Sequence, residues 1–204
     1  NKMPLTTVLS EENIVLYGDD YLEEELCGLR FKIGASSFFQ VNNVQTEKLY
    51  NKVLELGFFK STDTVIDAYC GIGTISLMLA KKVKHVYGVE VVKEAIKNAY
   101  DNATLNNIKN ITFEAGLAEE VVEKWNKKAN ALVVDPPRKG MDEKLIKTIL
   151  KANFEKIVYV SCNPTTLARD IKLLKDQYKV KTIQPVDMFP NTHHVETVVS
   201  LIRK

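Results

Sequence analysis

From about Val44 to the C-terminus, short apolar runs alternate with amphipathic stretches of helical periodicity. We predict seven strands here, formed by the runs TVIDAYC, HVYGVEVV, ITFEAG, ALVVDPP, KIVYVSC, TIQPVDMF and VETVVSLIRK. Strands separated by helices are joined by crossovers, which favours a mostly parallel sheet covered on both faces. The pattern therefore predicts an α/β fold with a seven-stranded sheet.

Residues 1–43 lack this alternation. They contain NIVLYGDD, EEELCGLRFKIG and SSFFQVNN, three short runs with turn-forming residues at or near their ends. The helical pattern starts at Val44 and reaches a plausible stop at Gly57. We therefore predict a β-rich N-terminal segment over residues 1–43 and a separate α/β domain over residues 44–204.

The composition argues against a disulfide-rich protein, a CxxC metal site and a membrane-spanning protein. The chain has 204 residues, 26% of them charged, and a formal net charge of +2, which by itself does not indicate a nucleic-acid binder. Its three cysteines, Cys27, Cys70 and Cys162, form neither a disulfide framework nor a CxxC knuckle. No apolar run reaches the ~18 residues that span a bilayer. We expect a cytoplasmic protein without a membrane segment.

A glycine-containing loop follows the first predicted strand. Gly71 and Gly73 allow a sharp turn and close approach to a ligand, with a helix opening at Thr74. Glu90 ends the second strand, nineteen residues after Gly71, where a carboxylate can accept both hydroxyls of a ribose. The pair favours an adenosine-containing cofactor over a tight turn with a solvated acid, and both NAD and S-adenosylmethionine fit.

The fourth predicted strand ends in VVDPPRKG. Asp135 stands at the strand end, and two prolines stiffen the loop and remove two backbone donors. Asp-Pro-Pro here resembles the methyl-transfer loop of nucleic-acid methyltransferases, whereas a rigid surface turn is the alternative. Enzymes that methylate amino groups place an aromatic residue after the prolines. Arg138 stands there instead, which argues against amino-group methylation.

Cys162 ends the fifth predicted strand, and Glu196 lies at the start of the last one. With Thr165 as the expected N-cap of the next helix, Cys162 is near a positive dipole end, which lowers a thiol pKa and suits a nucleophile. A small core residue is the alternative for Cys162, and an ion pair or cap for Glu196, which we interpret as a general base. His193 and His194 lack a third ligand at a recognised spacing, so no metal is predicted.

The segment DPPRKG, sixteen further residues and IVYVSCNPTT reproduce the paired signatures of the RNA (uracil-5-)-methyltransferase family. FFQVN and FPNTHHVE also resemble that family, so the likeness runs from about Phe38 to Leu201 and covers a C-terminal catalytic domain. The resemblance implies a Rossmann-like class I methyltransferase fold and S-adenosyl-L-methionine as cofactor. It also implies Cys162 as nucleophile, Glu196 as the proton-abstracting base, and contacts to the cofactor from Gln40, Tyr69, Glu90 and Asp135.

The implied reaction is methylation of uridine C5 in RNA, and we favour 23S rRNA over tRNA as partner. Family members also carry a small RNA-binding β-barrel and a central β domain, and residues 1–43 resemble the tail of that central domain. Arg138, Lys139 and Arg169 are candidate phosphate contacts, or a solvated basic rim. Three alternatives stay open: a cofactor-binding fragment inactive on RNA without those domains, an amino-group nucleic-acid methyltransferase, and a nicotinamide dehydrogenase.

Overall fold

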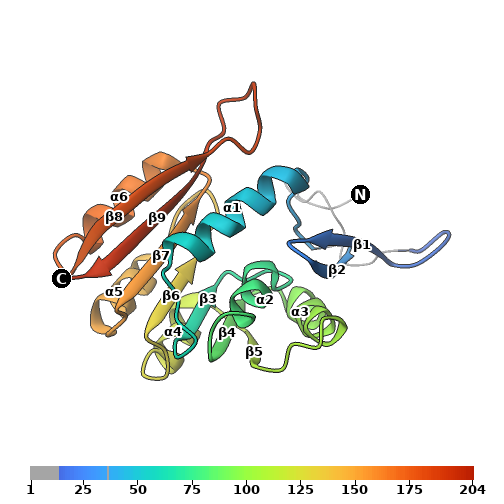
Figure 1. Cartoon of the computed structure of the whole chain (residues 1–204), viewed down its shortest axis with the longest axis horizontal. Helices are drawn as coiled ribbons and strands as arrows, with labels where there is room; N and C mark the ends of the chain where they lie inside the picture. Colours follow the sequence, from blue (N-terminus) through green and yellow to red (C-terminus); the bar gives the residue numbers. More distant parts are fainter. Residues whose placement is uncertain (1–13, 36) are drawn as a thin grey trace, which may run out of the picture.

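The computed structural model describes residues 14–35 and 37–204. Its main sheet has seven strands in the order β5-β4-β3-β6-β7-β9-β8 (Figure 1). Their bounds are β3 (Thr64–Ala68), β4 (His85–Glu90), β5 (Ile111–Ala115), β6 (Ala131–Val134), β7 (Lys156–Ser161), β8 (Tyr178–Val186) and β9 (Glu196–Arg203). Neighbouring strands are parallel except for β9, which is antiparallel to both β7 and β8. The predicted α/β fold with a seven-stranded, mostly parallel sheet is confirmed.

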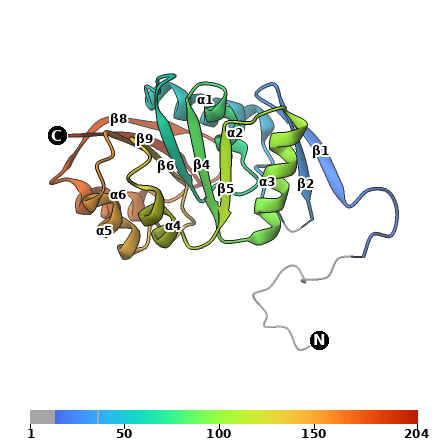
Figure 2. The same ribbon diagram turned by 90° about the horizontal axis from the view of Figure 1, so that it is seen from below.

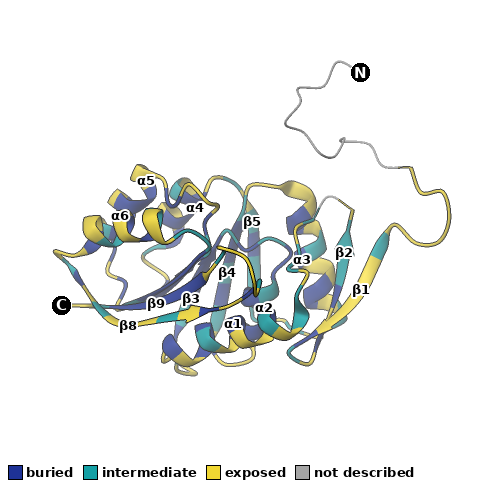
Figure 3. Ribbon diagram, turned by 90° about the horizontal axis from the view of Figure 1, so that it is seen from above, coloured by how far each residue is buried: buried dark blue, intermediate teal, exposed yellow. Residues whose placement is uncertain are grey.

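Helices cover both faces of this sheet, which forms the middle layer in Figure 3. One layer contains α1 (Asn43–Leu56), α2 (Thr74–Ala80) and α3 (Lys93–Leu105), and the other contains α4 (Ala118–Trp125), α5 (Glu143–Lys151) and α6 (Pro164–Leu174). Successive strand side chains point to opposite faces. In β3, Val65 packs in the core under α1–α3 and Ile66 in the core under α4–α6. The sheet thus divides two apolar cores.

A two-stranded hairpin, β1 (Tyr21–Leu26) and β2 (Leu29–Gly34), precedes α1. Cys27 and Gly28 form its turn with positive φ angles of 53° and 68°, as a two-residue hairpin turn of type I′ requires. Leu26 and Phe31 are fully buried in the core under α1–α3. The hairpin is therefore packed into the same core as the α/β layers.

Only one of the three runs predicted to form strands in the N-terminal segment does so. EEELCGLRFKIG lies within the hairpin, whereas residues 14–20 and 37–42 contain no strand, and residues 1–13 lie outside the described residues. Residues 37–42 instead link the hairpin to α1. Ser37 N–H donates to Gly34 O at 2.9 Å, and the Asn42 side chain caps α1 by accepting from Gln45 N–H.

Two further bounds differ from the prediction. β8 begins at Tyr178 rather than near Thr182 and retains Pro185, which an edge strand tolerates. Helix α6 begins at Pro164, and its N-cap is Asn163 instead of Thr165. Among the described residues, no helix combines the length and the hydropathy of a membrane span.

A polar cluster joins the amino ends of three strands, at the opposite edge from the predicted site. Lys156 Nζ lies 2.6 Å from Asp63 Oδ2 and donates to the Phe58 carbonyl at 2.8 Å. Asn130 donates to Asp63 Oδ1 and accepts from Thr64 N–H, both at 2.9 Å. Although burial alone raises the pKa of Asp63, these partners and the Lys60 amide hold that pKa below its ordinary value. The cluster fixes the starts of β3, β6 and β7.

Candidate functional site

The strand registers bring the predicted site residues to one edge of the sheet. Ala68 of β3 pairs with Val89 of β4 and with Val134 of β6, so the next residues, Tyr69, Glu90 and Asp135, leave their strands at the same level. This edge is where ligands bind in open α/β sheets.

The antiparallel pair β7 and β9 adds two residues to this edge. Ser161 pairs with Thr197. Cys162 therefore follows the end of β7 opposite Glu196, which starts β9. Because β9 runs against its neighbours, its first residue, rather than its last, reaches the carboxyl ends of the parallel strands.

These residues line a cavity of about 760 Å³. Seven of the eight predicted site residues face it: Gln40, Tyr69, Gly71, Glu90, Asp135, Cys162 and Glu196. Sequence reasoning missed part of the wall, notably Phe39, Phe189 and the loop after β5 with Gly116, Leu117 and Glu119. The position of that loop directly after a predicted strand was the available signal.

The glycine loop has three residues with positive φ, Tyr69 (69°), Gly71 (55°) and Gly73 (86°). Gly71 N–H donates to Glu90 Oε2 at 3.2 Å, and Glu90 Oε1 accepts from Val92 N–H at 3.0 Å. Each Glu90 oxygen keeps a further lone pair for a ligand. Glu90 is thus oriented by backbone groups at the cavity wall.

Gly73 does not line the cavity. It is buried at the start of α2, where an added Cβ would lie 2.9 Å from a Leu77 carbon and 3.0 Å from the Phe113 ring. Its missing side chain therefore allows α2 to pack closely against β5. The prediction that Gly73 lies at the cofactor site receives no support from this position.

Asp135 and Glu196 are two acidic side chains of the cavity whose pKa values are raised. Burial raises the pKa of Asp135 to about 8, and the negative charges of Glu196 and Asp67 add to the effect. Burial also raises the pKa of Glu196, whereas the positive charge of Arg138 opposes that shift. A carboxylate with a raised pKa is a stronger base, so Glu196 is suited to accept a proton.

The expected lowering of the Cys162 pKa is wrong. Burial raises the pKa of this thiol, the charges of Glu196 and Asp135 raise it further, and Arg138 opposes them only partly. Amide groups near the start of α6 already have acceptors, because Thr165 N–H donates to Asn163 Oδ1 and Asn163 N–H to Ser161 Oγ. Burial and the nearby acids therefore outweigh the effect of the helix dipole on the Cys162 pKa.

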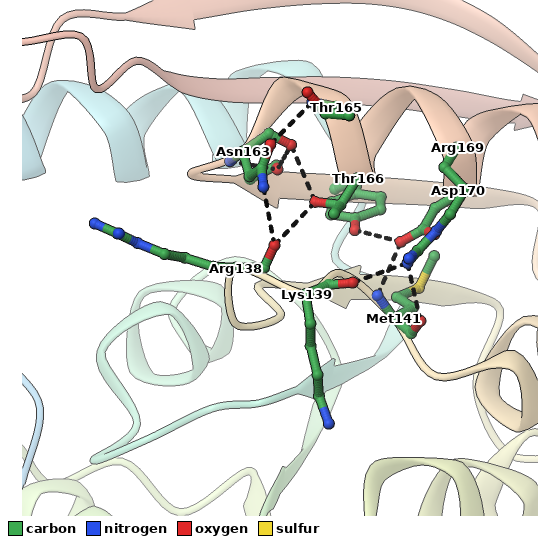
Figure 4. Close-up of polar contacts among 10 residues, drawn as sticks. Arg138, Lys139, Met141, Asn163, Thr165, Thr166, Arg169 and Asp170 are labelled. Carbon is green, nitrogen blue, oxygen red and sulfur yellow. Dashed lines mark hydrogen bonds and ion pairs between the residues drawn. The ribbon is translucent and has the colours of Figure 1, made fainter. Parts of the chain in front are cut away.

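Helix α6 holds the loop that follows Asp135 (Figure 4). Asn163 Nδ2 and Thr166 Oγ1 donate to the Arg138 carbonyl at 3.1 and 3.2 Å, and Arg169 donates to the Lys139 carbonyl at 2.9 Å. The side chains of Arg138 and Lys139 extend away from α6 and line the cavity. Arg169, predicted as a phosphate contact or rim residue, contacts this loop.

Asp170 lies beneath the same loop and is fully buried. Its carboxylate accepts from Met141 N–H at 2.8 Å, Tyr159 O–H at 2.7 Å and Arg169 Nε at 2.8 Å. Sequence reasoning missed Asp170, since an acid within a helix is most often solvated. These bonds fix the backbone of the loop that carries the side chains of Arg138 and Lys139.

The rings of His193 and His194 lie against each other in a tilted arrangement, with centroids 4.1 Å apart and an angle of 40° between their planes. In residues 14–35 and 37–204, no group of three His, Cys, Asp or Glu side chains could hold a metal ion.

Comparison with known proteins gives consistent matches. The sequence profile of the tRNA (Uracil-5-)-methyltransferase family matches residues 7–204. An uncharacterized RNA methyltransferase of Listeria innocua is 53% identical, over 100% of this chain and 46% of that protein. One from Staphylococcus epidermidis is 48% identical, over 100% of this chain and 45% of that protein. The chain thus spans about half the length of the curated relatives it matches.

Solved structures agree with this assignment. A tRNA (uracil-54, C5)-methyltransferase of Pyrococcus abyssi, in complex with S-adenosyl-L-homocysteine, superimposes with a TM-score of 0.82 and is 38% identical, covering 91% of this chain and 44% of that one. A tRNA m1G37 methyltransferase of M. jannaschii, 18% identical with a TM-score of 0.69 over 95% of this chain and 60% of that one, shares the fold. The Rossmann-like class I methyltransferase fold is confirmed, and the chain belongs to the tRNA (Uracil-5-)-methyltransferase family.

Proposed function

We propose that this chain carries the catalytic site of an RNA (uracil-5-)-methyltransferase, which transfers a methyl group from S-adenosyl-L-methionine to C5 of a uridine. The observation that carries the proposal is that Cys162 and Glu196, which flank the Ser161–Thr197 pair of β7 and β9, face the cavity that also contains the glycine loop and Glu90. A nicotinamide dehydrogenase needs neither of these two residues.

The cavity residues fit this cofactor. A Cβ added at Gly71 would meet no atom within 4 Å, so the missing side chain leaves open space on the cavity wall. Glu90 is oriented to accept ribose hydroxyls, and Gln40, Tyr69 and Asp135 supply further cofactor contacts. When bound, S-adenosylmethionine supplies an electrophilic methyl group on a sulfonium.

The chain's own residues activate the base. Uracil C5 is a poor nucleophile, and addition of the Cys162 thiolate to C6 forms a carbon–sulfur bond and concentrates negative charge on C5. Once C5 is methylated, Glu196 takes the C5 proton, and the bond from C6 to Cys162 breaks. Because the pKa of the free thiol is raised, the thiol must give up its proton to solvent before it adds to C6, which leaves Glu196 ionised to take the C5 proton.

The uridine must leave its stack to enter the cavity, which favours a single-stranded loop or a flipped nucleotide. Arg138 and Lys139 stand exposed at the rim, where phosphate groups of such an RNA could pass. The proposed partner is therefore RNA.

The substrate preference for 23S rRNA over tRNA stays a prediction, as does the cytoplasmic location. Methylation of separately purified rRNA and tRNA, followed by nucleoside analysis for 5-methyluridine, tests the preference. Label in an amino-methylated nucleoside instead would favour the amino-group reaction.

This chain spans about half the length of its curated relatives, which supports a second candidate function. Residues 1–43 would be the tail of a preceding central domain, followed by a methyltransferase domain at 44–204, and the catalytic part would bind cofactor but need further RNA-binding domains for activity. Tight cofactor binding by calorimetry, with no RNA retention in a gel shift, would identify this case.

Two substitutions test the chemistry in the full chain, with transfer of labelled methyl to RNA as the assay. Cys162→Ala should abolish formation of 5-methyluridine, whereas Cys27→Ala, outside the cavity, should retain it. Glu196→Gln should accumulate a denaturation-resistant protein–RNA adduct, because elimination stalls, and Glu119→Gln on the same cavity wall should not. Methylation at C5 by Cys162→Ala would disprove covalent activation, and absence of the adduct would remove Glu196 from the role of base.

A further inference from the structure

Helix α3 and its C-cap carry three asparagines four residues apart, Asn98 and Asn102 in the helix and Asn106 as the cap. This spacing puts them on one face of a helix. Figure 2 shows α3 beside β2, and the bonds below join these asparagines to the hairpin and the segment that follows it. We refer to the three residues as the asparagine row.

Two members of the asparagine row form hydrogen bonds with the outer edge of β2, as a neighbouring strand would. Asn106 accepts from Arg30 N–H at 2.9 Å and donates to the Arg30 carbonyl at 2.6 Å. Asn102 accepts from Lys32 N–H at 2.7 Å and donates to the Lys32 carbonyl at 3.2 Å. Each side-chain amide thereby satisfies both backbone groups of one residue on the outer edge of the hairpin.

Asn102 makes one bond that Asn106 does not. Its Nδ2 also donates to the Ile72 carbonyl at 3.2 Å, and the whole Asn102 side chain is buried. Ile72 lies between Gly71 and Gly73 in the loop that forms part of the cavity wall. One amide group therefore joins β2 to the glycine loop.

This loop needs support from outside itself. Tyr69, Gly71 and Gly73 all have positive φ angles, and Tyr69 pays a steric cost for that conformation. Strained backbone persists only where the surroundings fix it. The bond from Asn102, which does not line the cavity, fixes the central carbonyl of the loop.

We propose that Asn102 is a positioning residue that holds the glycine loop in the shape required for cofactor binding. Its two bonds to Lys32 of β2 keep the Asn102 side chain in place. The inference rests on the proposed function, because it takes this loop as part of the S-adenosylmethionine site. Asn98, which donates to Ser37 Oγ at 2.8 Å, and Asn106 hold the hairpin and its following segment without touching the loop.

Asn102→Asp and Asn106→Asp form a matched pair. Each substitution replaces Nδ2 by an oxygen and keeps the acceptor for β2. Each also removes two donated bonds, to the Lys32 and Ile72 carbonyls in the first case and to the Arg30 and Asn102 carbonyls in the second. Only Asn102→Asp removes a bond to the glycine loop, the one to the Ile72 carbonyl. Asn102→Ala and Asn106→Ala repeat the comparison without a buried charge.

Binding of S-adenosylhomocysteine to the full chain, measured by calorimetry where circular dichroism shows folded protein, is the primary readout. Both Asn102 variants should raise the Kd about tenfold, the scale of one lost buried hydrogen bond, and both Asn106 variants should leave it within about twofold. With RNA as substrate, the KM for S-adenosylmethionine should rise in the Asn102 variants, whereas kcat and the KM for RNA should not change.

Several outcomes would overturn the proposal. Unchanged binding in the Asn102 variants would show that the loop keeps its shape without them. Equal weakening in the Asn106 variants would assign the effect to the hairpin as a whole. Unfolding of both Asn102 variants, with both Asn106 variants folded, would show a structural role only. If the unsubstituted chain binds no S-adenosylhomocysteine, the proposed function fails instead.

Discussion

Asp67 offers a direct test of the electrostatics beneath the glycine loop. It lies in β3 with no exposed surface, and Ser76 Oγ donates to its Oδ2 at 2.5 Å. Its other oxygen, Oδ1, has no hydrogen-bond partner among the described residues. Burial raises the pKa of Asp67 to about 7, and the charge of Glu90 adds to this, while Ser76 opposes it. Ionised Asp67 therefore destabilises the fold.

The size of the effect follows from the two pKa values. An unfolded Asp has a pKa of ~3.9, and each pH unit between the unfolded and folded values changes stability by about 1.4 kcal/mol. Because the folded pKa is the higher one, the contribution of Asp67 is fully present below pH ~4 and is lost as pH rises towards 7. Relative to Asp67→Asn, the free energy of unfolding of the natural chain should fall by roughly 2 kcal/mol between pH 5 and 7.

Urea unfolding followed by circular dichroism at pH 5, 6, 7 and 8 measures this difference. Asp63→Asn is the control, because partners hold the pKa of Asp63 below its ordinary value. The contribution of Asp63 is present above pH ~4 and is lost only at more acid pH. Its difference curve should be flat from pH 5 to 8. A flat curve for Asp67→Asn as well would refute the reasoning.

Three other substitutions test separate parts of the structure. Lys156→Met leaves the buried Asp63 carboxylate without its cationic partner and should cost about 3–5 kcal/mol in urea unfolding. A loss below ~1 kcal/mol would mean that this pair acts like a surface ion pair. Glu196→Gln removes a charge that raises the pKa of Cys162, so alkylation of this thiol by iodoacetamide at neutral pH should accelerate, and an unchanged rate would contradict the coupling. Asp170→Asn removes an oxygen acceptor and should speed tryptic cleavage of the loop at 136–141, whereas an unchanged cleavage rate would show that α6 holds the loop without this acid.

The periodicity of apolar residues predicted the fold well, because it depends only on residues close together in the sequence. A buried parallel strand needs an apolar run, and a covering helix needs an apolar stripe, so the seven strands could be identified from neighbouring residues. The same logic found Glu90, which ends such a run, and Asp135 and Cys162, which directly follow one. The segment at 37–42 was wrongly expected to form a strand. Its apolar residues resemble a strand, but Phe39 and Gln40 face the cavity.

Other features depended on contacts between distant segments. The direction of the Cys162 pKa shift is set by burial first and then by the charges of Glu196 and Asp135 from distant segments, and no local pattern reports these surroundings. Gly73 looked like a ligand residue because only the packed structure shows its close contact with Phe113. Asn102 resembles an ordinary exposed helix residue until β2 and Ile72 are placed beside it.

The antiparallel strand β9 has a consequence for biosynthesis. It is the last strand of the sheet to be translated, yet it inserts between β7 and β8. Until the ribosome has released it, Cys162 lacks its opposite carboxylate and the pocket lacks one wall. The cavity is therefore complete only after every other strand of the sheet has been made.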